Sequence, residues 1–326
     1  MEIENTGETA TSPRQIPKRG WWQIVKRIKD ELAEDHVTIV AAGIAFYFFL
    51  AIFPALAALV SIYGLLVSPE DAASQIEEIA AVLPSEAGAM IGDMVGTLAN
   101  KPDEKLGWGL VVSILVSLWS AKKGTGALFE GLNIAYEEKD NRGFIKKNLL
   151  TLSVTVALVI GGIIAISLVA LVPAVIDLFP LPNAVASSLD FLRWPLVTGM
   201  IVVFLSWIYR VAPDRDSAEW KWLSVGSVMA TGLWLAGSAG FSWYIDTFGS
   251  MDKTYGSFAA VVVLLLWLFL TSFIILLGAE INSELELQTS VDTTTGPDAP
   301  MGERGAYCAD HVASKEAEAE SSSGTG

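Results

Sequence analysis

Apolar residues along this chain are gathered into long continuous blocks separated by polar segments. Six such blocks occur, at residues 37–67, 106–121, 149–172, 191–209, 223–245 and 258–278. A helix that crosses a hydrocarbon core of about 30 Å needs about 20 residues at about 1.5 Å each. The blocks lack the alternation of lipid-facing strands, so they predict helices and not a β-barrel. The sequence therefore predicts an all-α, polytopic membrane protein with six transmembrane helices.

Two of these blocks are short for a complete crossing. The second, at 106–121, lengthens only through the stretch "GTGALFEGL", and it then carries Lys122 and Lys123. The fourth reaches 191 only by including Arg193 near its start. A span shortened or interrupted by glycine is a place where membrane proteins expose backbone groups to a substrate. Lysines in the headgroup region at an ordinary helix end are the more common explanation.

Composition and charge support this topology and set its orientation. The chain is 52% hydrophobic and 17% charged, which is typical of a multi-pass membrane protein. Basic residues gather in the N-terminal segment and in the second and fourth connecting loops. Because positively charged flanks stay on the cytoplasmic side, both termini are predicted to be cytoplasmic.

The polar parts of the chain divide it into three regions. Residues 1–17 and the acidic residues 288–326 are predicted to be disordered tails, because they have too few apolar residues to repay ordering. Residues 18–287 form the predicted membrane domain. Between the first two spans, residues 67–102 contain two apolar stripes at helical spacing, which predicts an amphipathic helical loop on the external side.

Most enzyme chemistry finds no support in the sequence. Only two histidines occur, His36 and His311, and the single cysteine is Cys308, which disfavours a histidine or thiolate metal centre. No phosphate-binding loop is present, and the net charge of −15 gives no basic surface for nucleic acid. No catalytic residue, cofactor or metal site is predicted, and no nucleic-acid partner is expected.

The end of the sixth block raises a specific question, because it closes with the carboxylate Glu280. With both termini cytoplasmic, this residue is expected at the cytoplasmic rim, on a helix that continues through "INSELEL". One hypothesis is a latch, in which Glu280 pairs with a base at the same rim. The alternative is ordinary solvation of a helix end. The candidate rim cluster comprises Glu280, Asn282, Lys122, Lys123, Asn133 and Arg210, with Lys146 as a further candidate base.

The first span contains a second candidate feature. Pro54 removes one backbone hydrogen bond and is expected to kink the helix. Tyr47, about two turns earlier, has a hydroxyl that needs a partner if it is buried. The pair marks a candidate cavity, although simple packing would explain both residues.

Four stretches of this sequence resemble the YihY/virulence factor BrkB family of bacterial inner-membrane proteins. They are "AAGIAFYFFLAIFP", "LWSAKKGTGALFEGLNIAYE", "YRVAPDR" and "YGSFAAVVVLLLWLFLTSFIILLGAEIN". The resemblance extends from about Trp21 to Leu287 and implies a six-helix protein of the bacterial inner membrane. It also links the chain to envelope lipid export, to virulence and to an older ribonuclease BN label. The first span departs from the family pattern at Gly43, Phe46 and Ala51.

Three functions are compatible with these observations. The first is a lipid or apolar-solute transporter, or a helper in envelope-lipid export, with membrane lipids as partners. The second is a membrane scaffold that recruits an envelope protein or a second copy of itself. The third is a ribonuclease, which the acidic, histidine-poor sequence supports least.

Overall fold

The computed structural model describes residues 6–66, 103–178, 182–248 and 258–313, and these residues contain helices and no β-strand. Six long helices coincide with the six apolar blocks: α2 (Val37–Leu66), α5 (Asp103–Ala135), α6 (Phe144–Leu178), α7 (Asn183–Val211), α8 (Trp220–Phe248) and α10 (Phe258–Glu286). Three shorter elements accompany them: a 3-10 turn (Pro13–Gln15), α1 (Lys18–Glu34) and α11 (Tyr307–Asp310).

Four of these helices contain stretches long and apolar enough to cross a membrane, namely Val37–Ala55, Phe144–Val169, Ser187–Val211 and Val261–Glu286. The all-α, polytopic membrane fold is therefore confirmed, whereas the count of six spans and the cytoplasmic termini stay predictions. The two short blocks are parts of longer helices. α5 runs on past Lys122 and Lys123, and α7 begins before Arg193, whose guanidinium donates to the carbonyl oxygen of Val169 at 3.1 Å.

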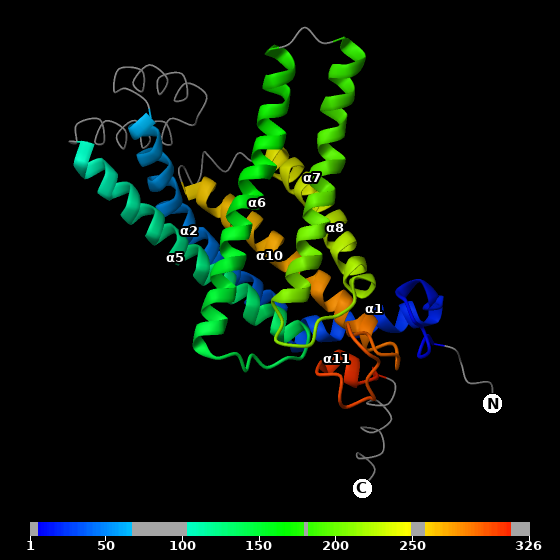
Figure 1. Cartoon of the computed structure of the whole chain (residues 1–326). Helices are drawn as coiled ribbons and strands as arrows, with labels where there is room; N and C mark the ends of the chain where they lie inside the picture. The colour runs from blue at the N-terminus through cyan, green and yellow to red at the C-terminus, as the bar shows by residue number, and fades with distance from the viewer. Residues whose placement is uncertain (1–5, 67–102, 179–181, 249–257, 314–326) are drawn as a thin grey trace, which may run out of the picture.

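α10 is the central helix of the bundle and packs against α1, α2, α5 and α8. The most extensive helix pair is α2 with α5, while α6 and α7 pack on each other beside it. Figure 1 shows that residues 6–17 and 288–313 and the loops 136–143 and 212–219 lie at one end of the bundle. We call this the tail-side end. Toward the opposite end, α2 and α5 lean away from α6 and α7 (Figure 1).

The amphipathic helix α1 lies across the tail-side end of α10. Ile24 is fully buried in a small core with Trp222, Ile281 and Leu285. Gly20 permits a close approach to the N-terminal segment, because a Cβ at this position would lie 2.1 Å from the carbonyl oxygen of Thr6. α1 is thus fixed to the bundle by one apolar stripe.

The described parts of both tails differ from the predicted disorder. Residues 288–313 form a compact cover over the end of α10, in which Thr289, Thr293 and Cys308 are buried. Arg304 ties this cover together by donating to the carbonyl oxygens of Ala299, Ser290 and Ala309. The segment is ordered by polar contacts, which a rule based on apolar content does not detect. Residues 6–17 likewise contain the 3-10 turn and bury Ala10 and Ile16.

Several predicted features fall outside the described residues. The amphipathic external loop at 67–102 is one of them, and so are residues 1–5 and 314–326 of the predicted tails.

Candidate functional site

The last three turns of α10 form a buried polar segment at the tail-side end. The helix continues through Glu286, as the sequence predicted, but every residue from Gly278 to Thr289 is buried. The polar residues in this stretch are Glu280, Asn282, Ser283, Glu284, Glu286, Gln288 and Thr289. Buried polar groups at this density must find partners inside the protein, because each unpaired group costs about 1–3 kcal/mol.

Gly278 and Gly226 form a very close crossing of α10 over α8. A Cβ on Gly226 would lie 2.1 Å from the carbonyl oxygen of Gly278, and a Cβ on Gly278 would lie 2.4 Å from the Tyr209 hydroxyl oxygen. That hydroxyl donates to the carbonyl oxygen of Ile275 at 2.8 Å. α7, α8 and α10 therefore meet at one point, which only glycine at both crossing positions allows.

Asn282 fixes the same crossing one turn further along α10. Its Oδ1 accepts a hydrogen bond from the backbone N–H of Gly226 at 2.7 Å, and its side chain also faces the Tyr136 hydroxyl. Tyr136 follows α5 directly and is fully buried. Asn282 therefore links α8 to α10.

Glu280 points to the junction between α1 and α2. Its side chain is 2% exposed, and its carboxyl group is hydrogen-bonded to that of Asp35. Two carboxyl groups can share a hydrogen bond only if one of them carries a proton. Burial raises the pKa of Asp35, and burial together with the charge of Glu284 raises the pKa of Glu31 to about 7. Acidic groups, and not basic ones, thus surround Glu280 on this side.

The latch hypothesis is therefore wrong about the partner of Glu280, and simple helix-end solvation is wrong as well. Lys122 donates to Asn148 Oδ1, and Lys123 lies over the ring of Trp119 at 5.5 Å. The Arg210 guanidinium lies 5.1 Å from the ring centre of Trp220. Lys146 is exposed. In the structure, these bases therefore meet an amide, an aromatic ring or solvent, and none is paired with Glu280.

Arg215 and Glu286 form a buried ion pair that the sequence reasoning missed. Their side chains are 2% and 0% exposed, and Arg215 Nη2 donates to Glu286 Oε2 at 2.7 Å. Thr293 from the tail donates to the same oxygen at 2.6 Å, and the guanidinium lies 4.9 Å from the ring centre of Tyr136. Burial alone would lower the pKa of Arg215, but the charge of Glu286 outweighs it and raises this pKa. The pair joins the 212–219 loop, α10 and the tail.

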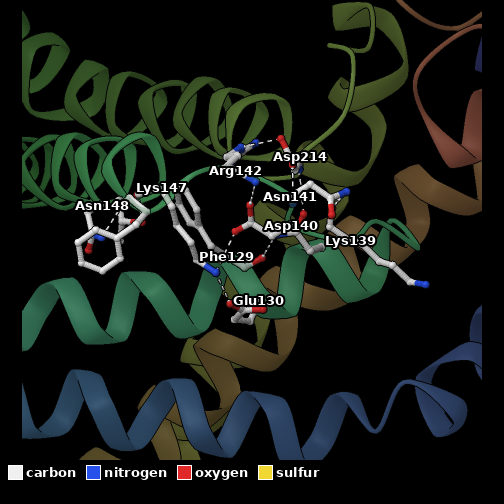
Figure 2. Close-up of polar contacts among 12 residues, drawn as sticks. Phe129, Glu130, Lys139, Asp140, Asn141, Arg142, Lys147, Asn148 and Asp214 are labelled. Carbon is white, nitrogen blue, oxygen red and sulfur yellow. Dashed lines mark hydrogen bonds and ion pairs between the residues drawn. The ribbon is translucent and has the colours of Figure 1, made fainter.

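Asn133 belongs to a neighbouring network that joins two tail-side loops. Its Nδ2 donates to the carbonyl oxygen of Phe129 at 2.9 Å, and its Oδ1 accepts from the backbone N–H of Asp214 at 2.8 Å. Figure 2 shows Arg142 reaching from the 136–143 loop to Asp214, with Nε donating to Oδ1 at 2.9 Å. The same arginine donates to the carbonyl oxygen of Ala212 at 2.8 Å. These contacts hold the α5–α6 and α7–α8 connections against each other.

The sequence gives little indication of the residues that contact Glu280 and Glu286. Asp35 is the last carboxylate before the first apolar block, and Arg215 closes the stretch "YRVAPDR". Neither position shows which residue far along the chain it will meet. The pairings depend on how the six helices are arranged, which periodicity alone does not determine.

An apolar hollow lies beside the predicted cavity residues of α2. It measures about 590 Å³, and it is lined by Phe48, Ala51, Ile52 and Ala55 of α2 together with residues of α5 and α6 and Leu268 of α10. Pro54 lies within α2 next to this lining, whereas Tyr47 is 40% exposed and is not part of it. The cavity is therefore adjacent to the predicted pair and formed by its neighbours.

A second apolar hollow of about 380 Å³ lies between α6, α7, α8 and α10. Leu158 of α6 lines both hollows and separates them. Trp234 and Thr271 border the smaller one and are joined by a hydrogen bond of 3.1 Å from the indole N–H to the threonine hydroxyl. Both volumes lie within the range of about 300–1,000 Å³ that is common for ligand sites.

Comparison with known proteins places this architecture in a family. The model of the virulence factor BrkB family matches residues 28–302, which include the glycine crossing, the polar end of α10 and both hollows. This chain belongs to the virulence factor BrkB family. No solved structure significantly matches it.

Individual relatives agree with this assignment. The ribonuclease-like protein YfkH of Bacillus subtilis (strain 168) is 30% identical over 251 residues, covering 75% of this chain and 88% of the relative. A UPF0761 membrane protein of Aliivibrio salmonicida (strain LFI1238) is 24% identical, covering 81% and 83%. A UPF0761 membrane protein of Vibrio atlanticus (strain LGP32) is 25% identical, covering 81% and 82%. The chain is thus similar to membrane proteins along most of their length.

Proposed function

We propose that this BrkB-family membrane protein handles a lipid or another apolar solute, as a transporter or as a helper in envelope-lipid export. We place it in the bacterial cytoplasmic membrane with both termini in the cytoplasm. The observation that carries the proposal is the larger apolar hollow between α2, α5 and α6. A hollow of this kind accepts hydrocarbon and offers little to a polar substrate.

The shape of the larger hollow suits one acyl chain. Its lining on α5 runs from Ile114 to Thr125, a rise of about 16 Å at about 1.5 Å per residue. The tail-side limit of this lining is polar, because Thr155 Oγ1 donates there to Thr125 Oγ1 at 2.9 Å. Apart from Ser117, the lining is apolar before this threonine pair, which suits a lipid with its headgroup toward the tail-side end.

Basic groups lie near the threonine pair on the same helices: Lys122 precedes Thr125 by about one turn of α5, and Lys147 lies on the tail side of Thr155 on α6. Lys122 of α5 donates to Asn148 of α6, and Lys147 forms ion pairs with Glu130 and Asp140 at 2.6 and 2.9 Å. Long basic side chains at this level extend toward headgroup phosphates. Lys122 is therefore the residue that we assign to headgroup contact.

Lipid retention tests the proposal directly. The full-length protein, extracted under mild conditions, is examined by native mass spectrometry for a stoichiometric bound lipid. We expect a retained lipid that is lost in Ala121→Phe, which fills the hollow, and weakened in Lys122→Gln. The matched control is Val156→Phe, because Val156 lies on α6 beside Thr155 but is exposed and does not line the hollow.

Equal retention in Ala121→Phe and Val156→Phe would show annular lipid only and would refute a specific site. A protein without bound lipid would favour the scaffold function, with an envelope protein or a second copy as partner.

The ribonuclease function rests on the name of the B. subtilis relative. The net charge of −15 and the acidic surroundings of Glu280 oppose binding of a polyanion. RNA cleavage that co-purifies with the intact protein, and is absent from an inactive variant, would revive it.

A further inference from the structure

The outer face of α1 carries a stripe of basic and apolar residues. Lys18, Trp22, Val25 and Lys29 follow one another at helical spacing, so they lie along one side of α1 over about 16 Å. Trp22 is 62% exposed and Val25 is 51% exposed, and both lysines are exposed as well. We call these four residues the α1 stripe. Aromatic and aliphatic side chains flanked by lysines are typical of a helix that lies in a membrane surface.

The lysines of the α1 stripe are not used inside the protein. Among the described residues, no ion pair or hydrogen bond joins the side chain of Lys18 or Lys29 to another group. Lys26, which is next to the stripe, places its Nζ 5.6 Å from the ring centre of Trp22. Three positive charges therefore surround an exposed tryptophan and are available to an anion outside the chain.

The opposite side of α1 fixes the direction of the stripe. Ile24 is fully buried in the small core with Trp222 and Leu285, and Ile28 packs against the same core. α1 cannot roll about its axis without withdrawing these isoleucines from the core, which would cost their hydrophobic burial. The stripe is thus held on the side of α1 that is turned away from the bundle.

The connection to α2 holds α1 at the membrane boundary. α1 ends at Glu34, and the apolar stretch of α2 that is long enough to cross a membrane begins at Val37. Three residue steps reach at most about 11 Å, so the end of α1 lies within that distance of the start of the apolar stretch. His36 has a φ of +50°, in the left-handed region, and turns the chain between the two helices. α1 therefore lies where α2 meets the headgroup layer.

We propose that the α1 stripe lies in the headgroup layer of the membrane and binds anionic phospholipids. Trp22 and Val25 contact the boundary between headgroups and acyl chains, and the lysine ammonium groups meet the phosphates. Basic residues at this level are attracted to an anionic membrane surface. Asp30, which such a surface would repel, lies about 140° around the helix from Val25.

This contact has a consequence for the whole tail-side end. α1 packs on the buried end of α10 through Ile24, so lipid bound to its outer face fixes the end of α10 at the level of the headgroups. The inference goes beyond the lipid-handling function, since it concerns a surface outside the bundle and residues that line neither apolar hollow.

Fluorescence quenching in nanodiscs tests the direction of the stripe. A fluorophore is attached to Val25→Cys in the full-length protein, and Asp30→Cys, an exposed position on another side of α1, is the matched control. Cys308 is buried, so the label attaches to the introduced cysteine. With phosphatidylglycerol that carries a nitroxide near its headgroup, we expect several-fold stronger quenching at Val25→Cys than at Asp30→Cys. With acrylamide, a quencher dissolved in water, we expect the reverse order.

The preference for anionic lipid tests the lysines. The label at Val25→Cys is expected to be quenched more by nitroxide-labelled phosphatidylglycerol than by nitroxide-labelled phosphatidylcholine. Lys18→Gln/Lys29→Gln is expected to lower this preference roughly fivefold or more, because each base near an anionic surface adds to the attraction. Lys139→Gln/Lys221→Gln is the matched control, since it removes two exposed lysines outside α1. All four lysines are exposed, so both variants are expected to fold and to keep the parental Tm.

Three results would overturn the proposal. Equal quenching of the two labels from the lipid would mean that the stripe faces water and is open to a soluble partner instead. An unchanged lipid preference in the α1 double variant, or an equal loss in the control variant, would show that the stripe lysines do not select the lipid. Ala121→Phe, which fills the larger hollow, is expected to leave these values unchanged, so the lipid-handling function and the surface proposed for α1 can fail separately.

Discussion

The two ends of the helix bundle are built on different principles. At the tail-side end, α10 is buried on all sides and joined to its neighbours by a glycine crossing, an ion pair and asparagine hydrogen bonds. In the membrane-spanning part, only 12–28% of the residues in one apolar 18-residue window of each stretch are buried inside the protein, and two hollows separate the helices. Specific polar pairs hold the tail-side end together, while the membrane-spanning part presents apolar surface and two hollows.

This difference indicates where rigidity and function lie. Helices in lipid gain little from burying more apolar surface, because lipid tails are as apolar as leucine. Specific association must therefore come from close packing and polar pairs, which this protein concentrates at the tail-side end. The membrane part is then free to keep hollows without losing the fold.

The largest expected effect follows from opening the buried ion pair. Arg215→Met leaves the Glu286 carboxylate buried without its cation, which is expected to lower the free energy of unfolding by about 3–5 kcal/mol. Denaturant unfolding in detergent, followed by tryptophan fluorescence, measures this. The double variant Arg215→Met/Glu286→Leu removes both charges and should recover much of the loss.

The matched control is Lys221→Met, which breaks an ion pair with Glu219 whose side chains are 43% and 38% exposed. Such a pair is worth less than about 1 kcal/mol. If Arg215→Met were no more destabilising than Lys221→Met, the tail-side end would not be locked by its polar pairs, and the contrast between the two ends would fail.

The second effect comes from filling the helix crossing. Gly226→Ala places a methyl group 2.1 Å from the carbonyl oxygen of Gly278 and 2.5 Å from Asn282 Oδ1, so α8 and α10 must move apart. We expect a loss of about 1–3 kcal/mol in unfolding free energy. Gly232→Ala on the same helix is the control, since nothing lies within 4 Å of its added Cβ. A comparison of Tm values for the two variants suffices, and equal values would contradict a close crossing.

A smaller effect is expected in the membrane part itself. Thr155→Val removes the hydrogen bond to Thr125 at the polar limit of the larger hollow while keeping the shape of the side chain. Hydrogen bonds between membrane helices average about 0.6 kcal/mol. We therefore expect almost unchanged stability but weaker lipid retention in native mass spectrometry. A loss of stability like that of Gly226→Ala would show that the hollow region is as tightly coupled as the tail-side end.

The sequence predicted the elements of this fold better than their contacts. The six apolar blocks became six long helices, and α10 continues through Glu286 as expected, because helical length and apolar runs are local properties. The partner of Glu280 was predicted wrongly. Glu280 was expected to meet a base at the same predicted cytoplasmic rim, but the packing of α1 on α10 brings Asp35 to it instead. Such a contact depends on how helices far apart in the sequence are arranged.

The described residues of the tail are ordered for a reason that apolar content does not detect. Residues 288–313 contain few apolar side chains, and low apolar content usually means disorder. Here order comes from hydrogen bonds to backbone carbonyls, chiefly those of Arg304, and from Cys308, which is packed against Ser283 of α10. Burial raises the pKa of the Cys308 thiol, so slow reaction with maleimide reagents in the folded protein is a further sign of this packing.

The smallest expected effect tests whether this cover is folded, through the acid stability of Asp292. Burial would raise its pKa, but hydrogen bonds from the backbone N–H groups of Ala299 and Thr294 outweigh burial and hold its pKa below the usual value. Because the folded-state pKa is lowered, the stabilisation is present above the unfolded value of about 3.9 and is lost as the pH falls through and below it. Asp292→Asn should therefore lower the Tm slightly at pH 7 and have less effect at pH 3.

The control is Asp298→Asn, which changes an exposed carboxylate in the same segment and is expected to leave the pH profile of the Tm unchanged. If both variants gave the same profile, the segment after α10 would contribute no ordered structure. The polar contacts that stabilise the tail-side end would then stop at Glu286.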